Sequence, residues 1–149
     1  MVEPPRDPEQ IVVLATTADG TRAALGEAKR ISAQFTSARI IVLVPRVVSY
    51  LTPPDGPREA AVITAQYREL VSRSGAEAAV HLCVCRGRDD MLRSMVSRQS
   101  IVVVGGCCRW WWPTSEQQIA RNVKNMGYAS RFVEVPAARR AAMRRMAMG

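Results

Sequence analysis

Short runs of consecutive apolar residues recur along the chain, separated by stretches of mixed polarity. Runs of this kind, flanked by turn-forming residues, are typical of strands that are covered on both faces of a sheet. Pro45 is expected to limit the second run, and residues 46–57, which are rich in proline, are expected to form an irregular connection. The pattern predicts five strands, at Ile11–Ala15, Ile40–Val44, Ala79–Cys85, Ile101–Val104 and Arg131–Val135.

Between these runs, apolar residues lie three and four positions apart, which is the spacing of one helix face. Asp19-Gly20-Thr21 has turn and cap chemistry before the first helix, and Ser74-Gly75 ends the second. Thr114 or Ser115 caps the fourth helix, Ser115 with Gln118 fits a capping box, and Gly127 closes it. The predicted buried faces are Leu25, Ala28, Ile31 and Phe35; Val62, Ile63, Tyr67, Leu70 and Val71 within 58–73; Met91, Leu92, Met95 and Val96 after Asp89-Asp90; and Ile119, Val123 and Met126.

Strands therefore alternate with helices from one end of the pattern to the other. Continuous apolar strands in that order predict an α/β fold: a three-layer α/β/α arrangement with a five-stranded parallel sheet and helices on both faces. In such sheets ligands bind beyond the carboxyl ends of the strands, near the point where the strand order reverses. The region after Ala15, Val44 and Val104 is therefore the place to look for a site.

The chain of 149 residues has material for one domain. We expect a disordered leader over 1–10, the folded domain over 11–136, and a basic tail over 137–149. The net charge is +8, and only Lys29 and Lys124 are lysines, every other base being arginine. This bias is explained by composition and solvated surface, or by an anionic partner; nucleic acid is the less favoured partner.

Several protein classes do not fit the sequence. The longest apolar run, Ile101–Cys108, is far shorter than the roughly 20 residues of a membrane-spanning helix. The first residues are acidic and proline-rich, unlike a signal peptide, so a cytoplasmic protein without a membrane span is expected. There is no Walker loop, no GxGxxG turn and no nucleophile elbow beside the single histidine, His81. We therefore expect no catalytic residues and no enzyme activity.

Four segments carry a resemblance to a known family. They are Ile11–Ala15 with the helix that follows, Ile41–Val48, Val84–Asp90, and Ile101–Gly106 with the loop, capped helix and short strand after it. In this order and spacing, over roughly residues 10–136, the chain resembles the universal stress protein family and looks like a divergent member of it. The resemblance implies the strand order 3-2-1-4-5 and a homodimer, often paired through the fifth strand, here Arg131–Val135.

The family contains members that bind ATP and members that do not. The binding members place an Asp after the first strand and hold phosphates with a Gly-x-x-Gly loop, a spacer, and Gly-Ser or Gly-Thr at the next helix. Here Thr16 stands at the Asp position, Cys108 replaces the second loop glycine, and Pro113-Thr114 or Thr114-Ser115 replaces Gly-Ser. Pro113 also removes a backbone donor that a phosphate would need. If a nucleotide binds at all, the residues that would hold it are Thr16, Val44, Gly105, Gly106, Thr114 and Ser115.

Three consecutive tryptophans, Trp110, Trp111 and Trp112, fill the loop that this family usually keeps small. Each indole normally buries about 150–250 Å², and three in a row cannot all enter one core. The loop therefore plugs the pocket, contacts a second copy or another protein, or stacks on a ligand base. Arg86-Gly87-Arg88 with Asp89-Asp90 either grips an anion or caps the short helix in water.

His81, Cys83 and Cys85 alternate along the third strand, and Cys107 and Cys108 follow the fourth. In the strand order that the family implies, these two strands are separated by about 14 Å, too far for one tetrahedral zinc ion. We therefore expect core cysteines and no metal site, with metal binding, redox chemistry and a vicinal disulfide as the alternatives.

The sequence favours a dimeric, non-catalytic regulatory or interaction module with a degenerate nucleotide loop. One alternative is a working ATP or AMP binder with at most slow hydrolysis. Another is a cytoplasmic regulatory domain detached from a transporter.

Overall fold

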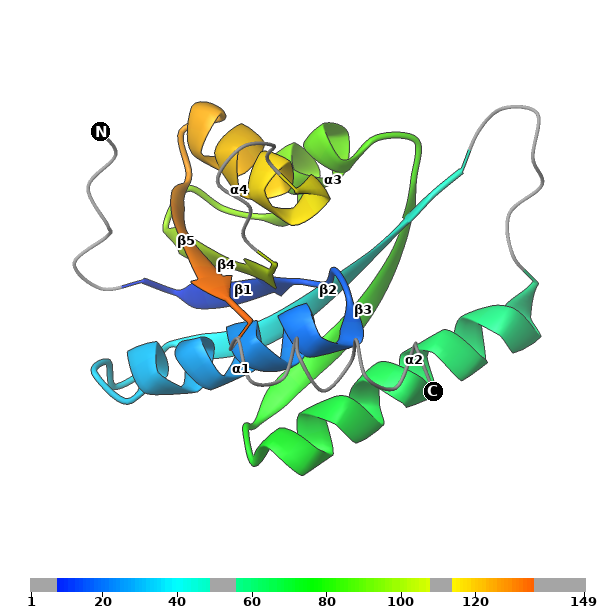
Figure 1. Cartoon of the computed structure of the whole chain (residues 1–149), viewed down its shortest axis with the longest axis horizontal. Coiled ribbons are helices and arrows are strands. Elements are labelled where there is room, and N and C mark those ends of the chain that lie inside the picture. The colour runs from blue at the N-terminus through cyan, green and yellow to red at the C-terminus, as the bar shows by residue number, and fades with distance from the viewer. Residues whose placement is uncertain (1–7, 49–55, 108–113, 136–149) are drawn as a thin grey trace.

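The computed structural model describes residues 8–48, 56–107 and 114–135, which form one five-stranded parallel sheet flanked by helices (Figure 1). The strand order is β3-β2-β1-β4-β5, so both the predicted α/β class and the order implied by the family are confirmed. The strands are β1 (Gln10–Leu14), β2 (Arg39–Val47), β3 (Ala78–Cys85), β4 (Ser100–Gly106) and β5 (Ala129–Glu134). The helices are α1 (Ala18–Ser32), α2 (Pro57–Ser74), α3 (Arg88–Met95) and α4 (Ser115–Asn125).

Two apolar cores lie on opposite faces of the sheet. Helices α1 and α2 cover one face, where Ala24, Leu25 and Val71 pack on Ile11 and Val13. Helices α3 and α4 cover the other, where residues such as Leu92, Val123 and Tyr128 pack on the alternate residues of the same strands. Because β1 and β4 contribute to both cores, their side chains are almost wholly excluded from water.

The second strand runs past the proline that was expected to limit it. Pro45 pairs with Cys83, and Arg46 and Val47 continue the ladder with β3. The β1 ladder ends where Leu14 faces Leu43, so beyond that point β2 has a partner on one side only. A proline is tolerated in a strand that has such an open side, which is why the expected irregular connection starts later.

The ends of two helices also differ from the prediction. The first helix takes Thr17 as its N-cap, and Asp19, Gly20 and Thr21 form its first turn. The fourth takes Thr114 as its N-cap, and the capping box joins Thr114 to Gln117 rather than Ser115 to Gln118. The box forms one residue earlier because the Thr114 hydroxyl also donates to the Cys107 carbonyl, at 2.7 Å.

Some side chains expected in the core face water instead. Val62 and Met95 are each about half exposed, at 51% and 50%. Phe35 lies beyond the end of α1 but still packs against the core. Strand β1 begins at Gln10, inside the segment expected as a leader, and the Glu9 amide donates to the Gln99 carbonyl at 3.2 Å.

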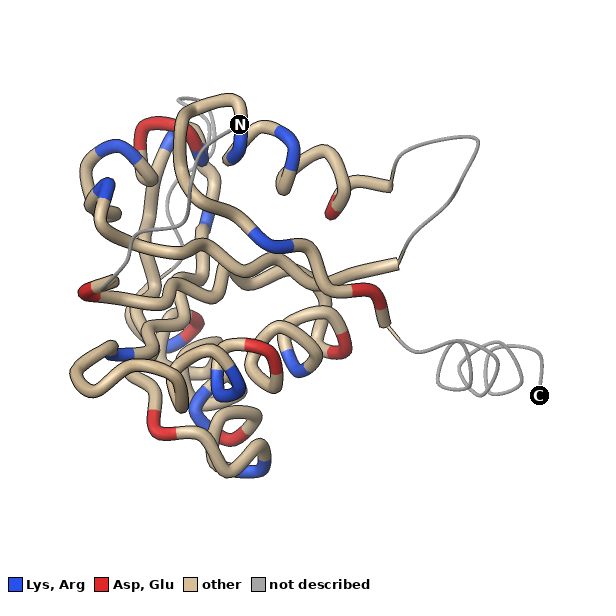
Figure 2. Tube along the Cα trace, turned by 90° about the vertical axis from the view of Figure 1, so that its left-hand side faces the viewer, with Lys and Arg blue, Asp and Glu red and all other residues tan. Residues whose placement is uncertain are grey.

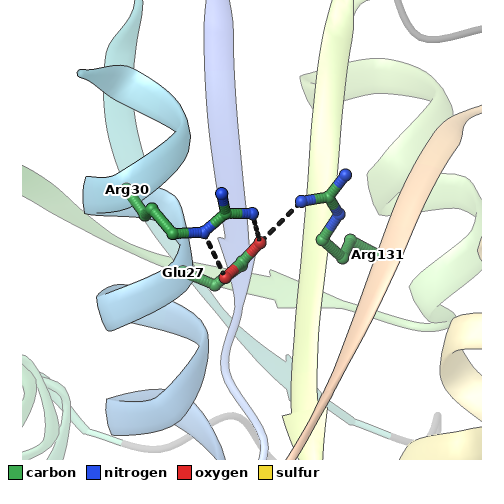
Figure 3. A network of polar contacts seen from close by, with 3 residues as sticks. All are labelled: Glu27, Arg30 and Arg131. Atoms are coloured by element: carbon green, nitrogen blue, oxygen red, sulfur yellow. Dashed lines mark hydrogen bonds and ion pairs between the residues drawn. The ribbon is translucent and has the colours of Figure 1, made fainter. Parts of the chain in front are cut away.

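An ion-pair network ties the first helix to the last strand. The Glu27 carboxylate of α1 accepts hydrogen bonds from Arg30 on the same helix and from Arg131 on β5, the latter at 2.6 Å (Figure 3). These bonds lower the pKa of Glu27 from 4.5 to about 2. The network fixes how α1 lies against the β5 edge of the sheet.

Candidate functional site

The candidate site lies beyond the carboxyl end of β1, where the strand order reverses. The chain leaves β1 through Ala15, whose amide donates to the Leu43 carbonyl at 2.9 Å, and then turns into α1. The Thr16 amide donates to the Thr21 hydroxyl at 3.1 Å, and the Thr16 hydroxyl donates to the Gly105 carbonyl at 2.7 Å. The hydroxyl at the position of the family's Asp is thus bonded to the chain's own backbone.

Gly105 is needed for packing rather than for an open loop. A Cβ atom added to Gly105 would overlap the Gly20 carbonyl, and one added to Gly20 would overlap the Gly105 carbonyl. The start of α1 therefore lies directly against the end of β4, backbone on backbone. Only glycine at both positions permits this approach.

Side chains of the fourth helix occupy the corner beside Gly106. A Cβ atom on Gly106 would overlap the Cβ and Cγ atoms of Glu116, which lies in the first turn of α4. The Gln117 amide donates to the Thr114 hydroxyl at 3.2 Å, and the Thr114 amide donates to the Gln117 side chain at 2.8 Å. The corner beside β4 therefore already holds a carboxylate side chain and a closed capping box.

A cavity of about 390 Å³ remains beside this corner. It contains three of the six predicted site residues, Thr16, Val44 and Ser115, whereas Gly105, Gly106 and Thr114 are not among the residues that line it. The remaining lining residues are Ala15, Pro45, Arg46, Ile63, Gln66, Tyr67, Arg88, Glu116 and Ile119. Three of the twelve residues that line this cavity were thus among those predicted from the sequence.

Two arginines and one glutamate give the cavity a mixed charge. Arg46 follows Pro45 on the extended part of β2, and Arg88 begins α3. Burial raises the pKa of the Tyr67 phenol, and the charge of Arg46 opposes the rise, so Tyr67 is neutral at ordinary pH. Arg46 and Tyr67 were missed because they lie in segments that the pattern assigned to a connection and to a core face.

A second cavity, of about 460 Å³, adjoins the first and shares Arg88 and Ile119 with it. Gly87, Asp89 and Asp90 line it, so the Arg-Gly-Arg-Asp-Asp segment does lie beside the candidate site. Its two carboxylates stand in the first turn of α3, where they favour the positive end of the helix dipole.

The other predicted groups lie elsewhere. Cys83 and Cys85 pack under α3, and burial raises the pKa of both thiols; the charge of Arg88 opposes this rise at Cys85. His81 lies exposed on β3, outside both cavities of the candidate site. Among residues 8–48, 56–107 and 114–135, no group of three or more His, Cys, Asp or Glu side chains could hold a metal ion.

Trp110, Trp111, Trp112 and Cys108 lie outside the described residues, as does the basic tail. The three interpretations of the tryptophan loop and the vicinal disulfide therefore stay predictions. Basic and acidic residues both occur on each described helix, and Figure 2 shows the two kinds spread over the described part of the chain. None of the helices in the described part of the chain is long and apolar enough to cross a membrane.

Comparison with known proteins supports the fold. No protein-family model and no curated protein matches the chain. Among solved structures, the fold is similar to that of the universal stress protein from Archaeoglobus fulgidus, with a TM-score of 0.60 and 17% sequence identity. The similarity covers 85% of this chain and 94% of that one. The resemblance drawn from the sequence is thus confirmed at the level of the fold.

Proposed function

We propose that this chain is a non-catalytic, universal-stress-protein-like module for regulation or interaction, whose nucleotide-type pocket no longer holds a triphosphate. The proposal rests on one observation: the side chain of Glu116 lies against Gly106, in the corner where phosphates would have to approach the backbone. It describes a binding module that acts through its surface, as a homodimer, rather than through a chemical step.

Magnitudes favour exclusion of phosphate from this corner. A helix N-terminus at an exposed site contributes about 0.3–1 kcal/mol to anion binding. A carboxylate about 4 Å from a phosphate charge opposes it by about 1 to 4 kcal/mol near a protein surface. Since Glu116 stands in the first turn of α4, a phosphate seated at that distance would meet a repulsion equal to or larger than the attraction of the helix end.

The residues around the cavity also favour a non-catalytic role. The titratable side chains that line it are Arg46, Arg88, Glu116 and Tyr67. Arginine stays protonated and Tyr67 has a raised pKa, which leaves Glu116 as the one proton acceptor among them. His81 and the described cysteines are outside the lining.

The open cavity favours a second candidate function, the binding of adenosine or AMP. Its volume of about 390 Å³ is within the range of small-molecule sites. Arg46 and Arg88, which line the cavity, carry the positive charge that one phosphate would need. A nucleoside monophosphate would avoid the occupied corner that a triphosphate chain must enter.

Calorimetric titration of the full chain with ATP and magnesium, AMP and adenosine tests the proposal. The unaltered protein is expected to give no ATP binding at micromolar concentrations. Glu116→Ala should strengthen ATP binding by about tenfold or more, because it removes both the charge and the bulk over Gly106. The matched control is Glu69→Ala, an exposed glutamate of α2 that pairs with Arg73, which should leave ATP binding unchanged.

Micromolar ATP binding by the unaltered chain, with amide shifts at Thr16 and Gly106 in NMR spectra, would overturn the proposal. Binding of AMP or adenosine without ATP would favour the second candidate. Phosphate release from ATP that depends on a metal ion would contradict the non-catalytic assignment.

A further inference from the structure

Within residues 8–48, 56–107 and 114–135, strand β3 is an open edge of the sheet. It pairs with β2, and no other described segment pairs with its outer side. Its eight residues, Ala78–Cys85, include no charged side chain and no proline. Edge strands usually carry lysine, proline or a bulge, because free backbone N–H and C=O groups otherwise recruit another strand. The composition of β3 therefore indicates that something covers it.

The opposite edge differs in each of these respects. Strand β5 has six residues, and it carries the charged Arg131 and Glu134. Arg131 is bound to Glu27 of α1, which ties that edge to its own domain. Of the two edges, β3 is the longer and the uncharged one.

An open apolar groove of about 870 Å³ lies beside β3, between this strand and α2. Figure 1 shows α2 beside β3 at this margin of the molecule. Val84 and Met95, which line the groove, are 57% and 50% exposed, large values for apolar side chains. The wall formed by α2 consists of small side chains followed by one arginine: Pro57, Ala60, Ala61, Thr64, Ala65 and Arg68.

We propose that this surface, β3 with the groove face of α2, binds a second copy of the same chain about a two-fold axis. The two β3 strands would pair antiparallel and continue the sheet across the dimer. An uncharged strand can face its own copy without like charges meeting across the ladder. A charged peptide, in contrast, would find no acidic or basic side chain on β3 to pair with.

In the same arrangement, the charged residues of α2 in one copy are complementary to those of α2 in the other. Arg58 and Glu69 lie on one flank of the groove face, near opposite ends of the helix. When two α2 helices run antiparallel, Arg58 of each copy lies beside Glu69 of the other. Glu69 already accepts a hydrogen bond from Arg73 at 2.8 Å, so a second arginine would complete a small network.

A single two-fold axis is compatible with both the pairing of the β3 strands and the contact between the α2 helices. The groove is lined by β3 from Val80 to Val84, centred on Leu82, and by α2 residues on either side of Ile63 and Thr64. An axis through the centre of the groove therefore passes near the middle of the strand and the middle of the helix face. The small side chains of that face would let the two helices approach closely.

Sedimentation velocity of the full chain over a concentration series tests this proposal. The unaltered chain is expected to be a dimer at micromolar concentrations. Val84→Lys, on the exposed edge, and Ala61→Arg, on the groove face of α2, should each raise the dimer dissociation constant by about tenfold or more. Val84→Lys would bury an unpaired charge in the joined sheet, and Ala61→Arg would place two like charges close to the axis. Gln118→Lys is the matched control, since Gln118 is exposed on α4, on the other face of the sheet, and lies outside the groove.

Thermal unfolding of each variant, followed by circular dichroism, separates loss of dimer from loss of fold; two variants on different elements guard against misfolding of either. A monomeric wild-type chain would overturn the proposal, as would a monomer whose groove binds extended peptides. A dimer that survives both groove variants would also overturn it and would favour pairing through β5. The proposal rests on the homodimer that is part of the proposed function, but none of its variants lines the nucleotide-type pocket, so sedimentation and ATP titration can fail separately.

Discussion

At the scale of single residues, the unusual feature is a glycine pair that joins two elements distant in sequence. Gly20, in the first turn of α1, and Gly105, near the end of β4, are packed so closely that neither has room for a Cβ atom. The Thr16 hydroxyl bonds to Gly105 at the same place. This contact fixes the start of α1 beside the candidate site.

Replacing a glycine in α1 should therefore have opposite effects at its two positions. Gly20→Ala should lower the free energy of unfolding by about 1–3 kcal/mol, because its methyl group overlaps the Gly105 backbone. Gly26→Ala should raise it by about 0.5–1 kcal/mol, because Gly26 is exposed within the helix and has nothing near its Cβ position. Urea unfolding of the two variants measures both changes. Equal effects of the two substitutions would contradict the packing role of Gly20.

A sequence pattern cannot distinguish these two uses of glycine. Gly105 matches a glycine of the phosphate loop in position, but its surroundings show that it serves the α1–β4 contact. The same holds for Thr114, which was predicted to hold a nucleotide if one binds, and whose hydroxyl bonds to Cys107 and Gln117. Which partner a small residue has depends on the segment brought beside it.

At the scale of elements, the Glu27 network links α1 to β5, and its strength depends on ionisation. The pKa of Glu27 is about 2 in the folded chain against 4.5 for an unpaired glutamate. Because the folded value is the lower one, the contribution to stability is fully present above about pH 4.5. It is lost as the pH falls toward 2 and the carboxylate gains a proton.

We therefore expect Glu27→Gln to flatten the acid dependence of stability. Between about pH 5 and pH 2 the wild-type chain should lose about 1 kcal/mol more than the variant, a modest value because both guanidinium groups are half exposed to water. Denaturant unfolding at several pH values measures the difference. Glu9→Gln, which alters an exposed glutamate ahead of β1, should leave the slope close to that of the wild type. Identical slopes for wild type and Glu27→Gln would show that the network is not stabilising.

Element boundaries could be predicted well where their causes are local. The predicted end of α2 at Ser74-Gly75 is confirmed, since Gly75, with a φ of 75°, is the C-cap of this helix. Gly127, with a φ of 92°, follows α4. The extension of β2 through Pro45 could not be predicted, since it depends on how far β1 reaches on one side. The exposure of Val62 could not be predicted either, because it depends on which elements pack against α2.

At the scale of the whole molecule, β1 and β4 form the centre of the structure. They pair with each other and each has a further partner, and both are buried on both faces. Native-state hydrogen exchange should therefore be slowest for amides such as those of Val13 and Val103, which open only with global unfolding. Amides of α2, where the one wholly buried residue is Val71, should exchange faster. Slower exchange in α2 than in β1 would contradict this order.

The sequence by itself determined the order of strands and helices, because apolar periodicity depends on which faces are covered. It also determined the edge of the sheet where a cavity forms, since parallel strands bring their carboxyl ends together. Only the tertiary structure decided what fills that edge. Gly105 is used by α1 and Gly106 is covered by Glu116, while Arg46, Tyr67 and Arg88 line the cavity that remains. These contacts join residues far apart in the chain, and local sequence patterns carry no information about which distant residues come together.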